Sequence, residues 1–377
     1  MSTKEDGKRT RDENSLAKNN PTTDVEIASV PYTDISKLMA PGTQKRQPMT
    51  GFDEDYVDIV DYIVRCTHKI WEERGVGLIY THYGHNIAIH TTDGTVYGRD
   101  RVIADSLKTM NAFPDVRLIA DDVIWSGNDV DGYHSSHRIS WLGRNTGYSI
   151  YGPPTGRRVQ RYGVAHCLVN ENRVVEEWIC RDELALVNQL GYDPHQLAHA
   201  MIQKMIDSGQ TPPIPDIPGE SGRLRGQMQP EDPPQSVDEN DVEGFVRRAF
   251  HEIWNWRLLN KLQEYYVPNY MAFVPPYRKL YGRGDYMAWI LARMGAFSDL
   301  ALTVDHICYL GNMQKGRVAT RWHIQGTHDG PGWYGEPTGN PTFLMGITHQ
   351  EIENGLFVRE WSCFDEFALL KQITWPR

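Results

Sequence analysis

Apolar positions along the chain follow two spacings, which together predict an ordered series of helices and strands. Between Tyr56 and Ile70 apolar side chains recur every three or four residues, which is typical of an amphipathic helix running to about Glu73. Farther on, apolar runs separated by Gly, Asn and Asp are typical of strands. The elements expected next are, in chain order, a helix at 100–112, strands at 116–126, 132–142, 158–169 and 173–182, and helices at 184–190 and 194–207.

The second half of the chain repeats this series. A helix is predicted over Val242–Trp256, and strands are predicted over 301–310, 316–326, 341–352 and 356–364. Helices followed by long antiparallel strands are typical of an α+β domain. A strongly curved sheet that closes over its helices leaves a cone with one open mouth, and such mouths are common ligand sites.

The amino-acid sequence itself is also duplicated. Residues 138–190 align with residues 321–373 without a gap, at a constant offset of 183, and 19 of these 53 positions are identical. Glu177–Glu183, for example, recurs as Glu360–Glu366. A duplicated unit predicts two domains of similar fold and marks the residues that both copies keep.

Composition along the chain places the domain boundaries. Residues 1–48 are polar and charged and are expected to form a disordered tail, in which only Ile35–Met39 could dock. The first domain is predicted at 49–207 and the second at 239–377. Between them, residues 208–238 are rich in proline and are expected to form a linker without its own core.

Charge and cysteine content narrow the class of protein. The net charge of −10 argues against a general nucleic-acid binder, which should carry a basic surface. The sequence has no apolar run long enough to cross a membrane and no signal-like N-terminal segment, so a cytoplasmic protein is expected. Five cysteines without paired spacing indicate free thiols.

Three motifs carry a resemblance to a known family. The first is Arg321–His328, with the sequence RWHIQGTH. The second is Gly335–Gly339, with the sequence GEPTG before a predicted strand. The third is Val175–Trp178, followed by Asp182 and closed by Gln189–Gly191.

In combination these motifs resemble the SnoaL-like polyketide cyclase family, within the nuclear-transport-factor-two-like fold. The resemblance covers both repeats, roughly residues 56–192 and 242–373. It implies two tandem cone-shaped domains, each a curved antiparallel sheet wrapped around helices. The same fold hosts several kinds of enzyme as well as non-catalytic proteins, so the fold alone does not fix the function.

The resemblance also implies an acid/base pair in the second domain. Asp365 stands where the family carries its acid/base aspartate, and an apolar cone would hold such a carboxyl near a neutral pKa. His328 resembles a pocket-facing position and could donate a hydrogen bond to an enolate oxygen. Two structural readings stay open: Asp365 could cap a helix, and His328 could lie in a hairpin turn.

The first domain keeps only part of this pair. Asp182 matches the aspartate, but Asn145 takes the place of His328, and an amide does not shuttle protons at neutral pH. His166 and His349 match each other between the repeats, and both are expected to line the cones and assist catalysis. A structural histidine on a polar strand face is the alternative for each.

Substrate contacts are expected from Tyr281, Arg283, Arg321 and Trp333, and from Asn145 in the first domain. Arg283 could hold an acidic substrate at the mouth of the cone, although a surface ion pair is the usual role of such a residue. Neither a metal ion nor an organic cofactor is expected.

The predicted function is acid/base catalysis on a small carbonyl substrate through an enolate, in an aldol, retro-aldol, isomerase or cyclase reaction. A hydrolase that activates water in the same pocket is one alternative, and a non-catalytic ligand-binding or assembly module is another. The expected partner is a small molecule, with neither nucleic acid nor membrane. The two units are expected to pair as an intramolecular pseudo-dimer, and a homo-oligomer is left open.

Overall fold

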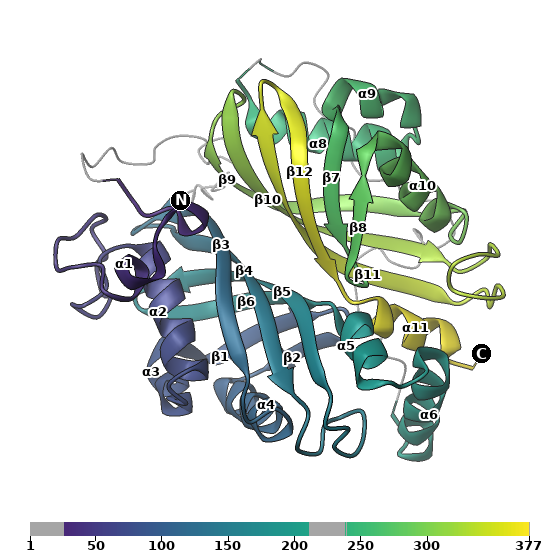
Figure 1. Ribbon diagram of the computed structural model, residues 1–377, viewed down its shortest axis with the longest axis horizontal. Coiled ribbons are helices and arrows are strands. Elements are labelled where there is room, and N and C mark those ends of the chain that lie inside the picture. The colour runs from purple at the N-terminus through teal and green to yellow at the C-terminus, as the bar shows by residue number, and fades with distance from the viewer. Residues whose placement is uncertain (1–25, 211–237, 239, 377) are drawn as a thin grey trace, which may run out of the picture.

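The computed structural model describes residues 26–210, 238 and 240–376. It contains two six-stranded sheets that pack against each other, with helices on the outer side of each sheet (Figure 1). Residues 1–25 of the predicted tail and residues 211–237 of the predicted linker lie outside the described residues. Among the described helices, none is both long and apolar enough to cross a membrane.

The first domain contains the predicted helices and strands in the expected order, with a further short helix and two strands at 79–97 that the expected series did not include. Its elements are α2 (Ile59–Trp71), α3 (Ile79–His82), β1 (Tyr83–Thr91), β2 (Gly94–Tyr97), α4 (Arg99–Ala112), β3 (Arg117–Asn128), β4 (Gly132–Arg144), β5 (Arg158–Asn170), β6 (Arg173–Arg181), α5 (Glu183–Leu190) and α6 (Pro194–Asp207).

The second domain repeats that order without an equivalent of α6. Its elements are α8 (Val242–Phe250) with a π-helical turn (His251–Asn255), α9 (Leu262–Tyr265), β7 (Tyr266–Val274), β8 (Arg278–Tyr281), α10 (Gly282–Met294), β9 (Ala301–Gly311), β10 (Lys315–Thr327), β11 (Pro341–Glu353), β12 (Leu356–Phe364) and α11 (Glu366–Thr374).

The two sheets have the same strand order. It is β2-β1-β6-β5-β4-β3 in the first domain and β8-β7-β12-β11-β10-β9 in the second. Neighbouring strands are antiparallel, except that β1 runs parallel to β6 and β7 runs parallel to β12. The α+β architecture of two tandem cones is therefore confirmed, and each sheet is mixed because of this one parallel pair.

Strand alternation gives each sheet two different faces. On β11, Thr348 and Gln350 face the helices of their own domain, where they contact Trp322 and Tyr270. The next residue along, His349, faces the other domain and contacts Ser136. Each sheet thus presents one face to its own cone and the opposite face to the second sheet, which makes the chain an intramolecular pseudo-dimer.

Residues 26–48 correct the expectation of a mostly disordered tail, although Ile35–Met39 docks as that expectation allowed. A short helix, α1 (Ile35–Met39), is capped by Asp34, whose side chain accepts a hydrogen bond from the Ser36 backbone N–H. Leu38 is buried and packs into the core of the first domain, as does Val30. The prediction of disorder relied on the composition of residues 1–48 as a whole, in which these few buried apolar side chains carry little weight.

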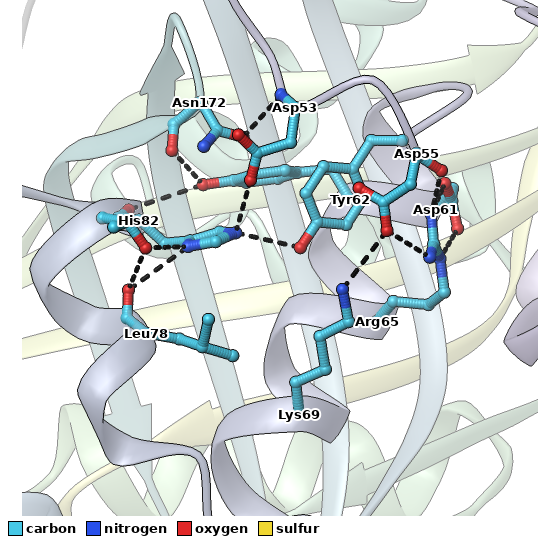
Figure 2. A network of polar contacts seen from close by, with 11 residues as sticks. Asp53, Asp55, Asp61, Tyr62, Arg65, Lys69, Leu78, His82 and Asn172 are labelled. Atoms are coloured by element: carbon cyan, nitrogen blue, oxygen red, sulfur yellow. Dashed lines mark hydrogen bonds and ion pairs between the residues drawn. The ribbon is translucent and has the colours of Figure 1, made fainter.

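The segment that follows α1 is tied to the end of the first cone. Figure 2 shows Asp53 between Asn172 and His82: its backbone N–H donates to Asn172 Oδ1 at 3.2 Å, and its carboxylate lies 3.7 Å from His82 Nε2. The Tyr62 hydroxyl donates to the Asn172 carbonyl at 2.9 Å. Phe52 packs edge-on against Tyr62, with ring centroids 5.1 Å apart. This segment therefore covers one end of the cone with both polar and aromatic contacts.

Candidate active site

A buried carboxyl group, Glu360 on β12, lies at the centre of the second cone. Its side chain accepts hydrogen bonds from Tyr270 and Tyr286 at 2.7 and 3.0 Å. Ser362 donates to it at 2.7 Å, and Gln350 Nε2 donates at 3.2 Å. Only 1% of Glu360 is exposed to solvent. The carboxyl is therefore held by four neutral donors, without an ion-pair partner among the described residues.

This polar network continues across the sheet. The Trp322 indole N–H donates to Thr348 Oγ1 at 2.9 Å, and Thr348 shares a 2.8 Å hydrogen bond with Ser362. Ser362 in turn donates to Glu360. These residues come from β10, β11 and β12, which are adjacent in the sheet and point their side chains to the same face. Strand register, rather than a loop, fixes the position of the carboxyl group.

Burial decides the charge state of Glu360. Desolvation raises the pKa of this carboxyl, and the hydrogen bonds from Tyr270, Ser362, Tyr286 and Gln350 only partly oppose the shift. A carboxylate whose pKa is raised is a stronger base than an ordinary glutamate, which suits it to accepting a proton from a substrate.

The neighbouring carboxyl of the same domain is bound differently. Glu366 Oε1 accepts hydrogen bonds from Arg293 at 2.6 Å and from the Tyr334 hydroxyl at 2.8 Å. Both Arg293 and Glu366 are buried. The buried contact with the Arg293 guanidinium makes Glu366 a structural anchor between α10 and α11.

The first cone has the matching carboxyl but not its donors. Glu177 on β6 corresponds to Glu360, because Glu177 pairs with Cys167 in the sheet as Glu360 pairs with Gln350. Burial raises the pKa of Glu177 as well. The offset of the repeat places apolar or weakly polar side chains at the four donor positions of the second cone: Ile87, Val102, Cys167 and Ile179.

Aromatic side chains fill the space around Glu360. The Tyr266 ring lies 4.7 Å from that of Tyr270 and 5.2 Å from that of Tyr286. Trp289 packs against both Tyr286 and Phe364. Two surface hollows, of about 410 and 210 Å³, are lined by neither Glu177 nor Glu360. A substrate would reach Glu360 only after some of these rings move.

Asp365 caps the last helix. Its side chain accepts a hydrogen bond from the Ala368 backbone N–H at 2.9 Å, so the helix-cap alternative describes its position. The pKa of Asp365 is raised well above its usual value by burial and by the nearby negative charges of Asp93 and Glu183. Because both of these belong to the first domain, the carboxyl lies at the junction of the domains.

Asp182 occupies the equivalent place in the first domain. It caps α5 by accepting from the Ala185 N–H at 3.1 Å, and it accepts from the Tyr277 N–H of the second domain at 2.9 Å. Its side chain is almost fully buried, and burial raises its pKa to about 7. Asp182 therefore links a helix start to the turn between β7 and β8.

His328 and Asn145 brace equivalent loops. Asn145 Oδ1 accepts a hydrogen bond from the Thr155 N–H at 2.8 Å. The Asn145 side-chain amide donates to the backbone carbonyls of Ala112 and Gly147. His328 Nδ1 lies 3.2 Å from Thr338 Oγ1, and its ring packs against Phe297. Both side chains are fully buried. No contact among the described residues joins His328 to Asp365.

His166 and His349 do not face the cones as expected. Both lie on the face of their sheet that packs against the other domain, because the strand parity that directs Thr348 toward the cone directs His349 away from it. His349 Nε2 lies 2.8 Å from Ser136 Oγ of the first domain. His166 lies among His134 and His306, with ring centroids 5.6 and 5.0 Å away. The two matched histidines are interface residues.

The residues expected to bind substrate are spread over the second domain. Tyr281 is 62% exposed and Trp333 is 48% exposed, with the Arg278 guanidinium stacked 3.5 Å above the Trp333 ring. Arg283, at the start of α10, is half-buried. Arg321 is buried between the domains, where its guanidinium lies 3.5 Å from the centre of the Trp178 ring. These residues do not converge on one pocket.

Sequence reasoning missed Glu360, although a signal was present. Glu177 and Glu360 are identical in both repeats and directly precede the matched residues Trp178 and Trp361. In a strand, adjacent residues face opposite sides, so a tryptophan at the domain interface places the preceding glutamate inside the cone. The partners of Glu360 come from distant strands and from α10, which local spacing could not reveal.

Comparison with known proteins assigns the chain to a family. The sequence model of the SnoaL-like polyketide cyclase family matches twice, at residues 62–190 and 245–373, which together make up more than half of the chain. The chain therefore belongs to the SnoaL-like polyketide cyclase family, as a tandem pair. Membership supports, in broad terms, a cyclase or isomerase type of function without a cofactor. No curated protein matches the chain.

Solved structures resemble one repeat at a time. A protein described as a SnoaL-like polyketide cyclase from Jannaschia sp. CCS1 is 19% identical, and the match covers 35% of this chain and 91% of that one, with a TM-score of 0.32. TsrD from Streptomyces laurentii is 22% identical, with coverages of 37% and 100% and a TM-score of 0.31. A SnoaL-like polyketide cyclase from Agrobacterium tumefaciens is 18% identical, with coverages of 35% and 96% and a TM-score of 0.30.

Proposed function

We propose that this protein is an acid/base enzyme that removes a proton next to the carbonyl group of a small substrate, in an isomerase, cyclase or aldol type of reaction. The observation that supports this most directly is the difference between the two cones. Both hold a buried glutamate, but only the second surrounds it with tyrosine, serine and glutamine donors. The second cone is accordingly the proposed site, and the first is its scaffold.

In the proposed step, ionised Glu360 takes the α-proton, and the electron pair of the broken C–H bond moves onto the carbonyl oxygen to form an enolate. The carboxyl loses its negative charge as it gains the proton and then holds hydrogen-bond donors less strongly. A hydroxyl of Tyr270 or Tyr286 is thereby released to donate to the enolate oxygen. The proton can return to a different carbon, which isomerises the substrate, or the enolate can attack a second carbonyl.

The family resemblance offers a second assignment within the same function. It places the base at Asp365, with His328 as the oxyanion partner and His349, Asp182 and His166 in supporting roles. The raised pKa of Asp365 is compatible with this role. Its hydrogen bond to Ala368 and its position at the domain junction favour Glu360 instead.

One experiment separates these assignments. A panel of small β-dicarbonyl compounds and β-keto esters is incubated with the full chain in deuterium oxide, and loss of the α-proton signal is followed by nuclear magnetic resonance. Glu360→Gln is expected to reduce exchange by about 100-fold or more, since general base catalysis contributes about that much. Glu177→Gln, the matched change in the first cone, should leave the rate unaltered.

The outcomes of this panel differ for each assignment. If Asp365→Asn abolishes exchange while Glu360→Gln does not, then the family-derived base is correct and Glu360 is structural. If the wild-type chain exchanges the α-proton of no compound in the panel faster than buffer alone, the proposal of enolate chemistry on these substrates is wrong. Circular dichroism of each variant shows whether its fold is intact.

A non-catalytic role is the second candidate, and the filled cones favour it. Aromatic rings occupy the interior of the second domain, and residues 49–58 cover one end of the first. A purely structural pair of domains would show no rise in unfolding temperature with any compound of the same panel. A rise that Glu360→Gln removes would contradict this candidate and support binding in the second cone.

A further inference from the structure

The interface between the two sheets has two ends that the repeat makes equivalent. Asp122 on β3 corresponds to His306 on β9, because Asp122 pairs with Arg138 in its sheet as His306 pairs with Arg321. By the offset of the repeat, His134 on β4 likewise corresponds to Arg317 on β10. The same positions therefore meet twice across the interface, once at each end.

At one end these positions form an ion pair. Arg317 of the second domain contacts the Asp122 carboxylate of the first, and both side chains are largely buried. His349, beside them, has its own partner in Ser136. Charge is thus balanced at this end, and one of the two ring nitrogens of His349 has a hydrogen-bond partner.

At the other end the ion pair is replaced by imidazoles. His134 of the first domain stacks on His306 of the second, with ring centroids 4.1 Å apart. His166 lies edge-on to His306 at 5.0 Å. One potential ligand nitrogen from each of the three rings lies within 4.8 Å of the other two. Three side chains from two domains converge here on one point.

His166 has ring contacts at this end of the interface but no hydrogen-bond partner among the described residues. It is completely buried, and neither of its ring nitrogens has a hydrogen-bond partner among the described residues. Its counterpart His349 bonds to Ser136, whereas the residue equivalent to that serine is Ala319, which has no hydroxyl. A buried polar group normally has a partner, because an unmet hydrogen bond costs about 1–3 kcal/mol.

We propose that His134, His166 and His306 bind one divalent transition-metal ion, with zinc as the first candidate, and that this ion joins the two domains. Three imidazole ligands and no carboxylate suit zinc rather than calcium or magnesium. Nitrogens around tetrahedral zinc lie about 3.4 Å apart, so small ring rotations bring these atoms into position. His134 and His306 are half-buried, which leaves an approach from solvent for the ion.

The surroundings of the three rings bear on this site. His306 directs Nδ1 toward the Cys308 thiol at 3.7 Å, which leaves Nε2 for the metal. The positive charges of Arg321 and Arg247 act on the cluster and oppose a cation, while the negative charge of Glu176 acts on His134 and favours one.

The test uses the full chain, freed of any affinity tag and stripped of metal with a chelator. Zinc or cobalt is added and the protein is dialysed, and bound metal is then counted by plasma mass spectrometry. We expect one ion per chain, a tetrahedral cobalt absorption band, and a higher unfolding temperature with zinc. His166→Ala should weaken zinc binding by more than about 100-fold, which exceeds the usual cost of losing a supporting contact.

Two variants control for loss of fold. The combined change His134→Arg and His306→Asp copies the ion pair of the opposite end, so it should fold normally and bind no zinc. His349→Ala removes the equivalent histidine at the opposite end and should keep one ion per chain. The proposal is overturned if the wild-type chain retains no zinc after dialysis, or if the double variant retains as much as the wild type.

Discussion

Asp182 illustrates how one buried carboxyl can tie stability to pH. Its pKa is about 7 in the folded chain and near 3.8 when unfolded, so between these values the folded chain holds more protons. The stability that this group contributes is complete below about pH 4 and is lost as the pH rises through about 7. The folded protein is therefore penalised for an ionised Asp182 at neutral and basic pH.

Asp182→Asn should remove this dependence. The free energy of unfolding of the variant minus that of the wild type is expected to be about 2–4 kcal/mol higher at pH 8 than at pH 4. Urea unfolding at the two pH values measures the difference. Asp193→Asn is the control, because Asp193 caps α6 in the same way but is exposed. An equal effect of both substitutions would contradict the buried-charge explanation.

Tyr270 is expected to tune the proposed base. Its hydroxyl donates to Glu360 at 2.7 Å and favours the ionised carboxylate. Tyr270→Phe removes that donor and raises the pKa of Glu360 further, so the acid limb of the pH–rate profile should move up by about 1 pH unit. Tyr265→Phe, which removes a hydroxyl bonded to Glu252, should leave the profile in place. A pH–rate profile that Tyr270→Phe leaves unchanged would contradict the proposal that Glu360 is the catalytic base.

At the scale of single residues, sequence could identify matched positions but not their surroundings. The repeat marked Asp182, Asp365, His166 and His349 as retained, and the local sequence already offered a helix cap for Asp365. The interface that surrounds these residues depends on contacts between domains, which the sequence does not show. Glu360 shows the opposite case: its retention was visible, but its four donors come together only in the folded sheet.

Helices and strands were predicted closely because their patterns are local. The expected strand at 356–364 is β12 to the residue, and the expected helix at 194–207 is α6. The sequence did not indicate that β1 runs parallel to β6, since pairing direction depends on the route of the chain rather than on apolar spacing. The ordering of residues 26–48 was anticipated only at Ile35–Met39, because it depends on a few buried anchors.

The contribution of α1 can be measured through its one buried leucine. Leu38 is 6% exposed and lies in the core of the first domain, so Leu38→Ala should lower the free energy of unfolding by about 2–3 kcal/mol. Ile35 lies in the same helix but is 58% exposed, and Ile35→Ala should change stability by less than about 0.5 kcal/mol. Equal effects on chemical unfolding would indicate that α1 does not pack against the domain in solution.

The whole molecule depends on the contact between two sheets, and the buried pair Asp122–Arg317 tests it. Asp122→Asn or Arg317→Met alone should cost about 3 kcal/mol, because each leaves a buried charge without its partner. The combined variant should cost clearly less than the sum of the two, since neither charge remains. Strictly additive losses in a double-mutant cycle would show that the pair is not coupled.

Because both copies lie in one polypeptide, this contact is not subject to the symmetry that constrains a dimer of identical subunits. In such a dimer every substitution appears twice, so a first-domain pair would place Asp122 opposite His134 at each end. In the tandem chain each end can drift on its own, and the two ends have become a guanidinium with a carboxylate and a cluster of imidazoles. Two equivalent ends of one interface therefore carry different chemistry in a single chain, which a dimer of identical subunits could not achieve.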